Sequence, residues 1–281
     1  MKKLLKKTIL LAVLTVIVVT ISQSAMNLPT DVAYYAISKA TEPNNCSAVI
    51  LGDSVCNQIW NQKENLGELC TLGSNQAITP CGSYLLLYTY LDAHPSTKTV
   101  YYAVRPQSLA NDMWTNFTYQ YFVLPFYNDE NVPLIEDETK ELLYEKFGKP
   151  FVTNQYLKMI LSHNQRLQDI YLARVQTGDN DVTNRLSRTA AIYLRKMQAL
   201  CEERGVKFVV RPLPLADTPE NQDWDLFRQD IVDYGFEDLL KNFIDDVDYY
   251  PLDWFVDGVH FTPDILAEHL ETFRSRALGD Y

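Results

Sequence analysis

The chain has 281 residues, a net charge of −11 and 47% apolar residues. This length and composition fit one large α/β domain with insertions, or two small domains, with enough apolar residues to bury a full core. Because the basic residues beyond the N-terminus form no stripe on this acidic chain, we expect no nucleic-acid partner, while neutral glycans remain open.

The N-terminal segment, residues 1–25, carries four lysines, then an apolar run over residues 9–21, and then small polar residues. This order is typical of a secretory signal peptide. The run is shorter than the about 20 residues that span a bilayer, but an uncleaved membrane anchor is compatible if Lys6 and Lys7 snorkel. In both cases we expect the lysines in the cytoplasm and the rest exported, either secreted or anchored facing outside.

Residues 26–45 are predicted to form a linker with a short helix over DVAYYAISKA. The domain proper, residues 46–281, then opens with an apolar strand over 48–51 that runs into Gly-Asp-Ser, followed by a helix over 55–61. Gly, Asp and Ser are good turn and helix-cap residues, so a plain structural turn is one interpretation. The other interpretation is a serine nucleophile, Ser54, at the carboxyl end of a parallel strand.

Strands and helices alternate through most of the remaining chain. Further strands are predicted over 68–74, 98–106 and 206–214, and helices over 82–94, over 183–204 with Gly205 closing it, and from Pro263 onward with Thr262 as cap. This order predicts a parallel sheet covered on both faces, in a flavodoxin-like three-layer α/β/α domain.

Residues 111–181 do not fit the alternation and are predicted to be a partly helical cap inserted between the third strand and the long helix. The segment is rich in Tyr, Phe and Trp. Such aromatic side chains either stack on sugar rings or form the private core of the cap, and we favour the core for most of them.

The five cysteines are odd in number and show no C-x-x-C spacing. Export would permit a disulfide and leave at least one free thiol, but we interpret these cysteines mainly as small buried apolar residues. No His, Asp or Glu spacing predicts a metal site, and no glycine pattern for nucleotides occurs, so no cofactor is expected.

Near the C-terminus, VDGVHFTPD places Asp257 and His260 three residues apart, just before the last helix. A turn there would let the carboxylate accept from one imidazole nitrogen and leave the other facing outward. That pair is the orienter and general base that a serine nucleophile needs. Because ligands bind at the carboxyl ends of parallel strands, the βα units would bring this pair to Ser54.

From about Cys46 to the end, the chain resembles the SGNH (GDSL-like) hydrolase superfamily. ILGDSV matches the first block of that family and DGVH the last. The resemblance implies Ser54 as nucleophile, with its own N–H in the oxyanion hole, His260 as base and Asp257 as orienter. With its export segment and aromatic insertion, the chain is similar to the membrane-anchored or secreted cell-envelope members.

The middle blocks depart from the family pattern, in which a Gly and an Asn donate to the oxyanion. The second block falls in TLGSNQAITP, where Gly73, Asn75 or Gln76 would supply the contact. The third lands on RPQSL, with Gln107 where Asn is usual and Asn111 as the alternative donor. A lost oxyanion donor costs about 100- to 1000-fold in rate, so the departure bears on activity more than on class.

Three charged residues, Asp53, Arg105 and Arg211, lie near strand ends. We expect Asp53 to anchor the turn structurally. Arg105 and Arg211 either pair with acidic neighbours or bind a carboxylate or phosphate of the substrate, and both alternatives stay open.

The expected function is an extracytoplasmic serine esterase, or an acyltransferase, acting on O-acyl esters of small molecules or of cell-envelope or extracellular glycans. The alternative is a catalytically weak accessory or glycan-binding protein of the cell envelope, which the altered third block and the large insertion favour. A pure binding module has no use for a working Ser, His and Asp, so the enzyme is the first hypothesis.

Overall fold

A four-stranded parallel sheet forms the centre of the protein in the computed structural model, which describes residues 6–7, 31–64, 66–113, 116–175 and 184–278. The strands are β1 (Ala48–Gly52), β2 (Leu69–Gly73), β3 (Thr99–Val104) and β4 (Lys207–Pro212), in the order β2-β1-β3-β4. Gly52 at the end of β1 is level with Gly73 and Ala103. The predicted α/β class with a parallel sheet is confirmed.

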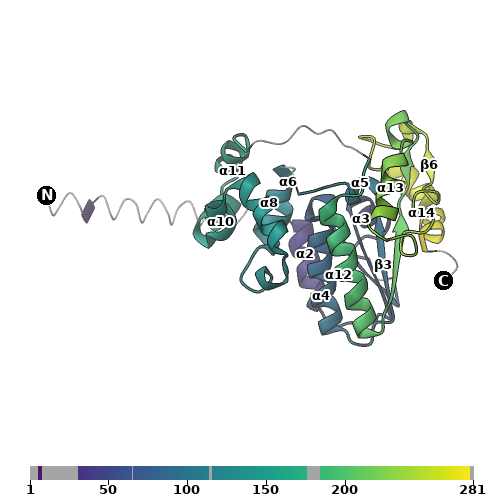
Figure 1. Ribbon diagram of the computed structural model, residues 1–281, viewed down its shortest axis with the longest axis horizontal. Helices are drawn as coiled ribbons and strands as arrows, with labels where there is room; N and C mark the ends of the chain where they lie inside the picture. Colours follow the sequence, from purple (N-terminus) through teal and green to yellow (C-terminus); the bar gives the residue numbers. More distant parts are fainter. Residues whose placement is uncertain (1–5, 8–30, 65, 114–115, 176–183, 279–281) are drawn as a thin grey trace.

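Helices cover both faces of this sheet, and accordingly all five residues of β1 and all five of β2 are buried. On one face lie α2 (Asp31–Thr41), α4 (Thr79–Ala93) and α12 (Arg188–Arg204), side by side in Figure 1. On the other face lie α3 (Ser54–Ile59) and α14 (Pro263–Leu278). Val49 and Leu51 of β1 belong to the first apolar cluster, and Ala48 and Ile50 to the second. This arrangement is consistent with three α/β/α layers.

Local signals in the sequence explain where the long helix α12 begins and ends. The Ser187 side chain accepts from the Ala190 N–H at the N-terminus, and Gly205 ends the helix in the left-handed conformation at φ 66°. The strand β4 then starts at Lys207.

The insertion between β3 and α12 is helical, and aromatic side chains form its core. After α5 (Pro106–Leu109), its described elements are α6 (Asn116–Thr118), the π-helical turn η2 (Tyr119–Val123), α7 (Leu124–Phe126), η3 (Val132–Leu134), α8 (Asp137–Phe147), α9 (Lys149–Thr153), α10 (Gln155–Ser162) and α11 (Gln165–Leu172). Tyr119, Phe122, Phe126 and Phe147 are buried. These aromatic side chains are buried in an apolar core, as predicted, but that core is shared with β1, α4 and α12 rather than private to the insertion.

The chain between β4 and the last helix was not resolved into elements by sequence reasoning. It forms η4 (Pro219–Asn221), α13 (Asp225–Asp233), η5 (Leu252–Trp254) and a separate two-stranded parallel sheet of β5 (Leu215–Ala216) and β6 (Tyr249–Tyr250). This small sheet places the start of the 250–262 turn region beside the end of β4.

The cysteines behave differently from the expectation that they are mainly small apolar residues. Cys46 and Cys70 form a disulfide that joins the start of β1 to β2, with Cα atoms 5.7 Å apart. Cys56, Cys81 and Cys201 are free and buried, as predicted.

The expected export segment, residues 1–25, lies almost wholly outside the described residues. Within the described ranges, no helix is both long enough and apolar enough to cross a membrane.

The disulfide gives a test of the first βα unit. It spans 24 residues in sequence, and the entropy of closing such a loop predicts a stabilisation of about 3 kcal/mol. We expect reductant to lower the free energy of unfolding of the wild type by about that amount in a denaturant titration. The double variant Cys46→Ser, Cys70→Ser should give the same value with and without reductant. A wild type insensitive to reductant would contradict the bond.

Candidate active site

Ser54, His260 and Asp257 form a continuous hydrogen-bonded chain at the carboxyl edge of the sheet. His260 Nε2 lies 2.8 Å from Ser54 Oγ, and His260 Nδ1 lies 2.8 Å from Asp257 Oδ2. The serine and histidine are 206 residues apart in sequence. The predicted meeting of these three side chains is therefore observed.

Ser54 is held by its position as the first residue of α3, directly after β1 and Asp53. A Cβ at Gly52 would lie 1.9 Å from Ala103 O and 2.5 Å from Cys56 Cβ, so only glycine lets the helix start this close to the strands. Among the described residues, none accepts a hydrogen bond from the Ser54 N–H. As the first N–H of a helix it has no intrahelical partner and can donate to a ligand.

Asp53 is a buried carboxylate that gathers donors from two βα turns. Its Oδ1 accepts from Val55 N at 3.0 Å and Cys56 N at 3.2 Å, which caps α3. Its Oδ2 accepts from Arg105 N at 3.0 Å and from the Ser108 hydroxyl. The Arg105 Nε lies 3.5 Å from the same oxygen as an ion pair. The expected structural role of Asp53 is confirmed.

The turn that carries His260 is fastened to α3 by Gln58. Gln58 Nε2 donates to Phe261 O at 2.7 Å, and its Oε1 accepts from Phe261 N at 3.0 Å. The Phe261 ring stacks on Phe273 of α14 at 4.4 Å between centroids. Since Gln58 lies one helical turn after Ser54, this double hydrogen bond fixes the histidine relative to the serine.

Asp257 also shapes the turn through its own backbone neighbours. Its Oδ1 accepts from Val259 N at 3.0 Å and from His260 N at 2.8 Å. Gly258, which follows Asp257 in this turn, adopts φ 76°. Partial burial raises the pKa of Asp257, but the hydrogen bonds from the His260 ring and from these two N–H groups outweigh it and lower the pKa to about 2. The orienting carboxylate is therefore ionised at any pH well above 2.

Of the second-block residues, Gln76 has its side-chain amide oriented by Arg105. Its Oε1 accepts from Arg105 Nη2, which turns the amide nitrogen the other way. Asn75 instead caps η1 (Gln76–Ile78), with Oδ1 accepting from Ala77 N at 2.9 Å. Gly73 is needed for packing, because a Cβ there would lie 2.8 Å from Asn57 N.

The structure gives the third-block candidates partners away from the triad. Gln107 Nε2 donates to Asn221 Oδ1 at 2.7 Å, while its Oε1 is buried without a partner in the part of the chain that is described. Asn221 Nδ2 in turn donates to Ala216 O. The Asn221 oxygen is therefore the acceptor toward Gln107, and Gln107 Nε2 is the donor. Asn111 is 6% exposed, and its Oδ1 accepts from Met113 N. The expectation that Gln107 presents its donor to the oxyanion therefore finds no support in this geometry.

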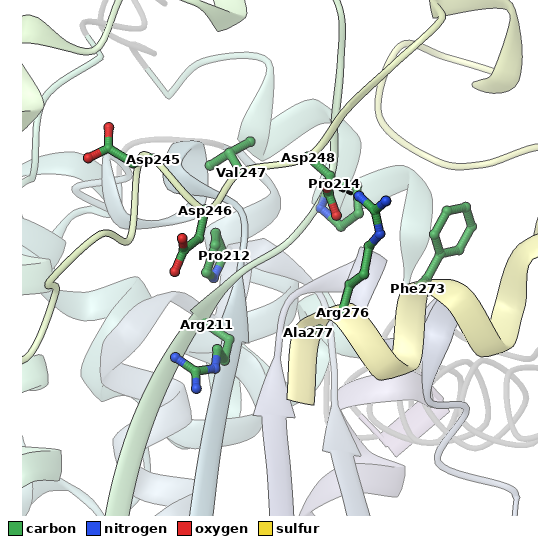
Figure 2. Close-up of a pocket in the computed structure, with 10 residues that line it drawn as sticks. All are labelled: Arg211, Pro212, Pro214, Asp245, Asp246, Val247, Asp248, Phe273, Arg276 and Ala277. Carbon is green, nitrogen blue, oxygen red and sulfur yellow. Dashed lines mark hydrogen bonds and ion pairs between the residues drawn. The ribbon is translucent and has the colours of Figure 1, made fainter. Parts of the chain in front are cut away.

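The two arginines differ from the substrate-binding expectation. Arg105 is 4% exposed and pairs with Asp53, so the acidic-neighbour alternative is correct for it. Arg211 lies within β4 rather than after it, and lines a pocket of about 470 Å³ that does not include the triad (Figure 2). Three aspartates also line that pocket, and Asp248 pairs with Arg276, which disfavours an anionic ligand there.

Sequence reasoning missed Gln58 and Asn221. Gln58 had a usable signal, because its spacing of four from Ser54 puts both on one side of a helix. Asn221 had none, since its partner Gln107 is 114 residues away. Within the described residues, no three His, Cys, Asp or Glu side chains are grouped as a metal site would need.

Comparisons with protein-family models, curated proteins and solved structures found no match to this chain.

The Asp53 cluster predicts a large loss of stability on substitution. Asp53→Ala would leave the buried Arg105 guanidinium without its counter-charge and should lower the free energy of unfolding by about 3–5 kcal/mol. The matched control is Asp112→Ala, which removes a carboxylate that accepts from the Thr189 backbone N–H and has no ion pair within the described residues. It should cost about 1 kcal/mol in the same denaturant titration. Equal losses would contradict the role given to Asp53.

Proposed function

We propose that this protein is an extracytoplasmic serine ester hydrolase, or an acyltransferase, of the SGNH type. The observation that carries the proposal is the chain Ser54–His260–Asp257, with 2.8 Å at both links. Nucleophile, base and orienter in this geometry are the parts that acyl transfer through a serine requires.

The order of the strands supports the same fold family. A sheet order of 2-1-3-4 is that of flavodoxin-like folds, in which ligands bind outside the carboxyl ends of strands 1 and 3. Ser54 follows β1, and Arg105 of the Asp53 cluster follows β3. We therefore propose the flavodoxin-like SGNH arrangement for the finer topology.

In the proposed reaction, Ser54 Oγ attacks the ester carbonyl carbon while His260 Nε2 takes the hydroxyl proton. Asp257 holds the imidazole through Nδ1–H and stabilises the charge that develops on the ring. The Ser54 N–H and the Gln76 amide are the proposed oxyanion donors. His260 then protonates the leaving alkoxide, and water or a sugar hydroxyl takes the acyl group from the serine.

The exposure of the site is compatible with esters carried on large molecules. The side chain of His260 is 36% exposed and that of Asp257 is 54% exposed. Such an open site accepts an acyl group presented on a glycan as readily as one on a small ester. The Cys46–Cys70 disulfide supports an oxidising, extracytoplasmic location.

The second candidate function is an accessory or glycan-binding protein of the envelope. The engagement of Gln107 with Asn221 favours it, because a usual oxyanion donor is then absent from the third block. The accessory function, however, assigns no role to the hydrogen-bonded triad. We therefore retain the enzyme as the proposal.

Covalent labelling of Ser54 separates the two functions. We expect a fluorophosphonate to phosphonylate the wild type, with loss of fluoride, and one mass addition located on Ser54. Ser54→Ala should take no label, and Asp257→Asn should slow labelling by about 10⁴-fold because the imidazole is then held in the wrong tautomer. Ser47→Ala, at the other end of β1, should label like the wild type. A wild type that does not react would favour the accessory protein.

A pair of amide substitutions tests the oxyanion donors. With a small acyl ester, Gln76→Ala should lower kcat by about 100-fold with little change in KM, because the donor acts in the transition state. Gln107→Ala should change kcat far less, since its amide is bound to Asn221. The reverse result, a silent Gln76→Ala and a crippling Gln107→Ala, would return the donor to the third block.

A further inference from the structure

Apolar side chains are exposed together on the two helices α10 and α11 of the insertion. The hairpin face, as we call it, consists of Tyr156, Met159 and Ile160 on α10 and Leu167 and Ile170 on α11, with exposed fractions of 44–77%. Their spacing of three and four residues places them on one side of each helix. Exposed apolar groups gathered in this way mark an interaction surface rather than ordinary surface composition.

The hairpin face continues into a hollow in the insertion. A pocket of about 1160 Å³ is lined by apolar residues of α8, α9 and α11, among them Leu142, Phe147 and Phe151. Leu167 and Ile170 belong both to its lining and to the hairpin face, so the apolar surface is continuous.

The charge around the hairpin face is opposite to that of the whole protein. From α9 to Val175, residues 149–175 carry four basic residues and one acidic residue, in a chain whose net charge is −11. Lys149, Arg166 and Arg174 are exposed. The fourth, Lys158, is buried, and its ammonium donates to Tyr127 O inside the insertion. Three exposed cations, against the single exposed acidic residue Asp169, therefore lie on the same segment as the apolar side chains and are complementary to anionic groups.

The hairpin belongs to an insertion that leaves the sheet at the edge where α2 begins. Gln62 Nε2 donates both to Val32 O at the start of α2 and to Gly73 O at the carboxyl end of β2. The insertion leaves the sheet at the same edge, after β3. Nine residues, 22–30, separate the apolar run from α2 and span at most about 30 Å. A retained anchor would keep this edge near the bilayer.

We propose that the hairpin face lies in the interfacial layer of an anionic membrane. Its apolar side chains would insert at the level of the head groups and upper acyl chains, and the three exposed cations would contact lipid phosphates. This inference does not depend on catalysis; export decides only which face of the membrane is bound. It would hold the triad edge close to the lipid surface.

Fluorescence of single probes in vesicles tests the proposal on the full chain. An environment-sensitive nitrobenzoxadiazole label is placed at Tyr156→Cys or Ile160→Cys, and as a control at Leu226→Cys, a position that is 55% exposed. Leu226 belongs to α13, a helix that lies well apart from α10 and α11 in Figure 1. The free native cysteines are buried, so labelled wild type gives the background. In phosphatidylcholine vesicles with phosphatidylglycerol, we expect blue-shifted emission and several-fold stronger quenching by nitroxide lipids at 156 and 160 than at 226.

The control position separates docking of the hairpin face from simple anchoring by the N-terminus. Omitting phosphatidylglycerol, or adding Lys149→Glu and Arg166→Glu, should reduce quenching at 156 several-fold. Quenching at 156 and 160 no stronger than at 226 would overturn the proposal. Cross-linking between two copies through Tyr156→Cys, with no quenching by lipids, would also overturn it and assign the face to a second copy.

Discussion

The buried carboxylate of Asp53 is the interaction on which the arrangement of the candidate site depends. It caps α3, so it sets the position of Ser54, and it holds the turn after β3 through the N–H and side chain of Arg105. Arg105 in turn orients Gln76. A single desolvated charge thus couples the serine to the side chain that we propose as an oxyanion donor, and neither would keep its place without it.

The second constraint is the attachment of the His260 turn, which comes from distant parts of the chain. Gln58 binds both backbone groups of Phe261, and the ring of Phe261 packs against α14. Asp257 fixes the turn internally through two N–H groups. These contacts join the His260 turn to α3, one helical turn after the serine, and to α14. The distance from base to nucleophile is therefore set by rigid elements rather than by a free loop.

The strands and the contact of Ser54 with His260 could be predicted because both follow from short-range patterns. Apolar runs ending in turn residues mark the strands, and parallel strands bring their carboxyl ends to one edge. The direction of the Gln107 amide could not be predicted, since it depends on Asn221 in a later turn. The role of Arg105 could not be predicted, because burial, which decides that role, is a tertiary property. The pairing of Cys46 with Cys70 was equally beyond reach, as connectivity does not follow from spacing alone.

The sheet divides the apolar interior into two clusters, one on each of its faces. The insertion, including Phe122 and Phe147, belongs to the cluster shared with α4 and α12, whereas Val55 and Phe261 beside the triad belong to the other. The strands therefore separate the packing of the insertion from the packing around the triad. The insertion can therefore change in length and surface, over evolution or in engineering, with little effect on the packing around Ser54 and His260.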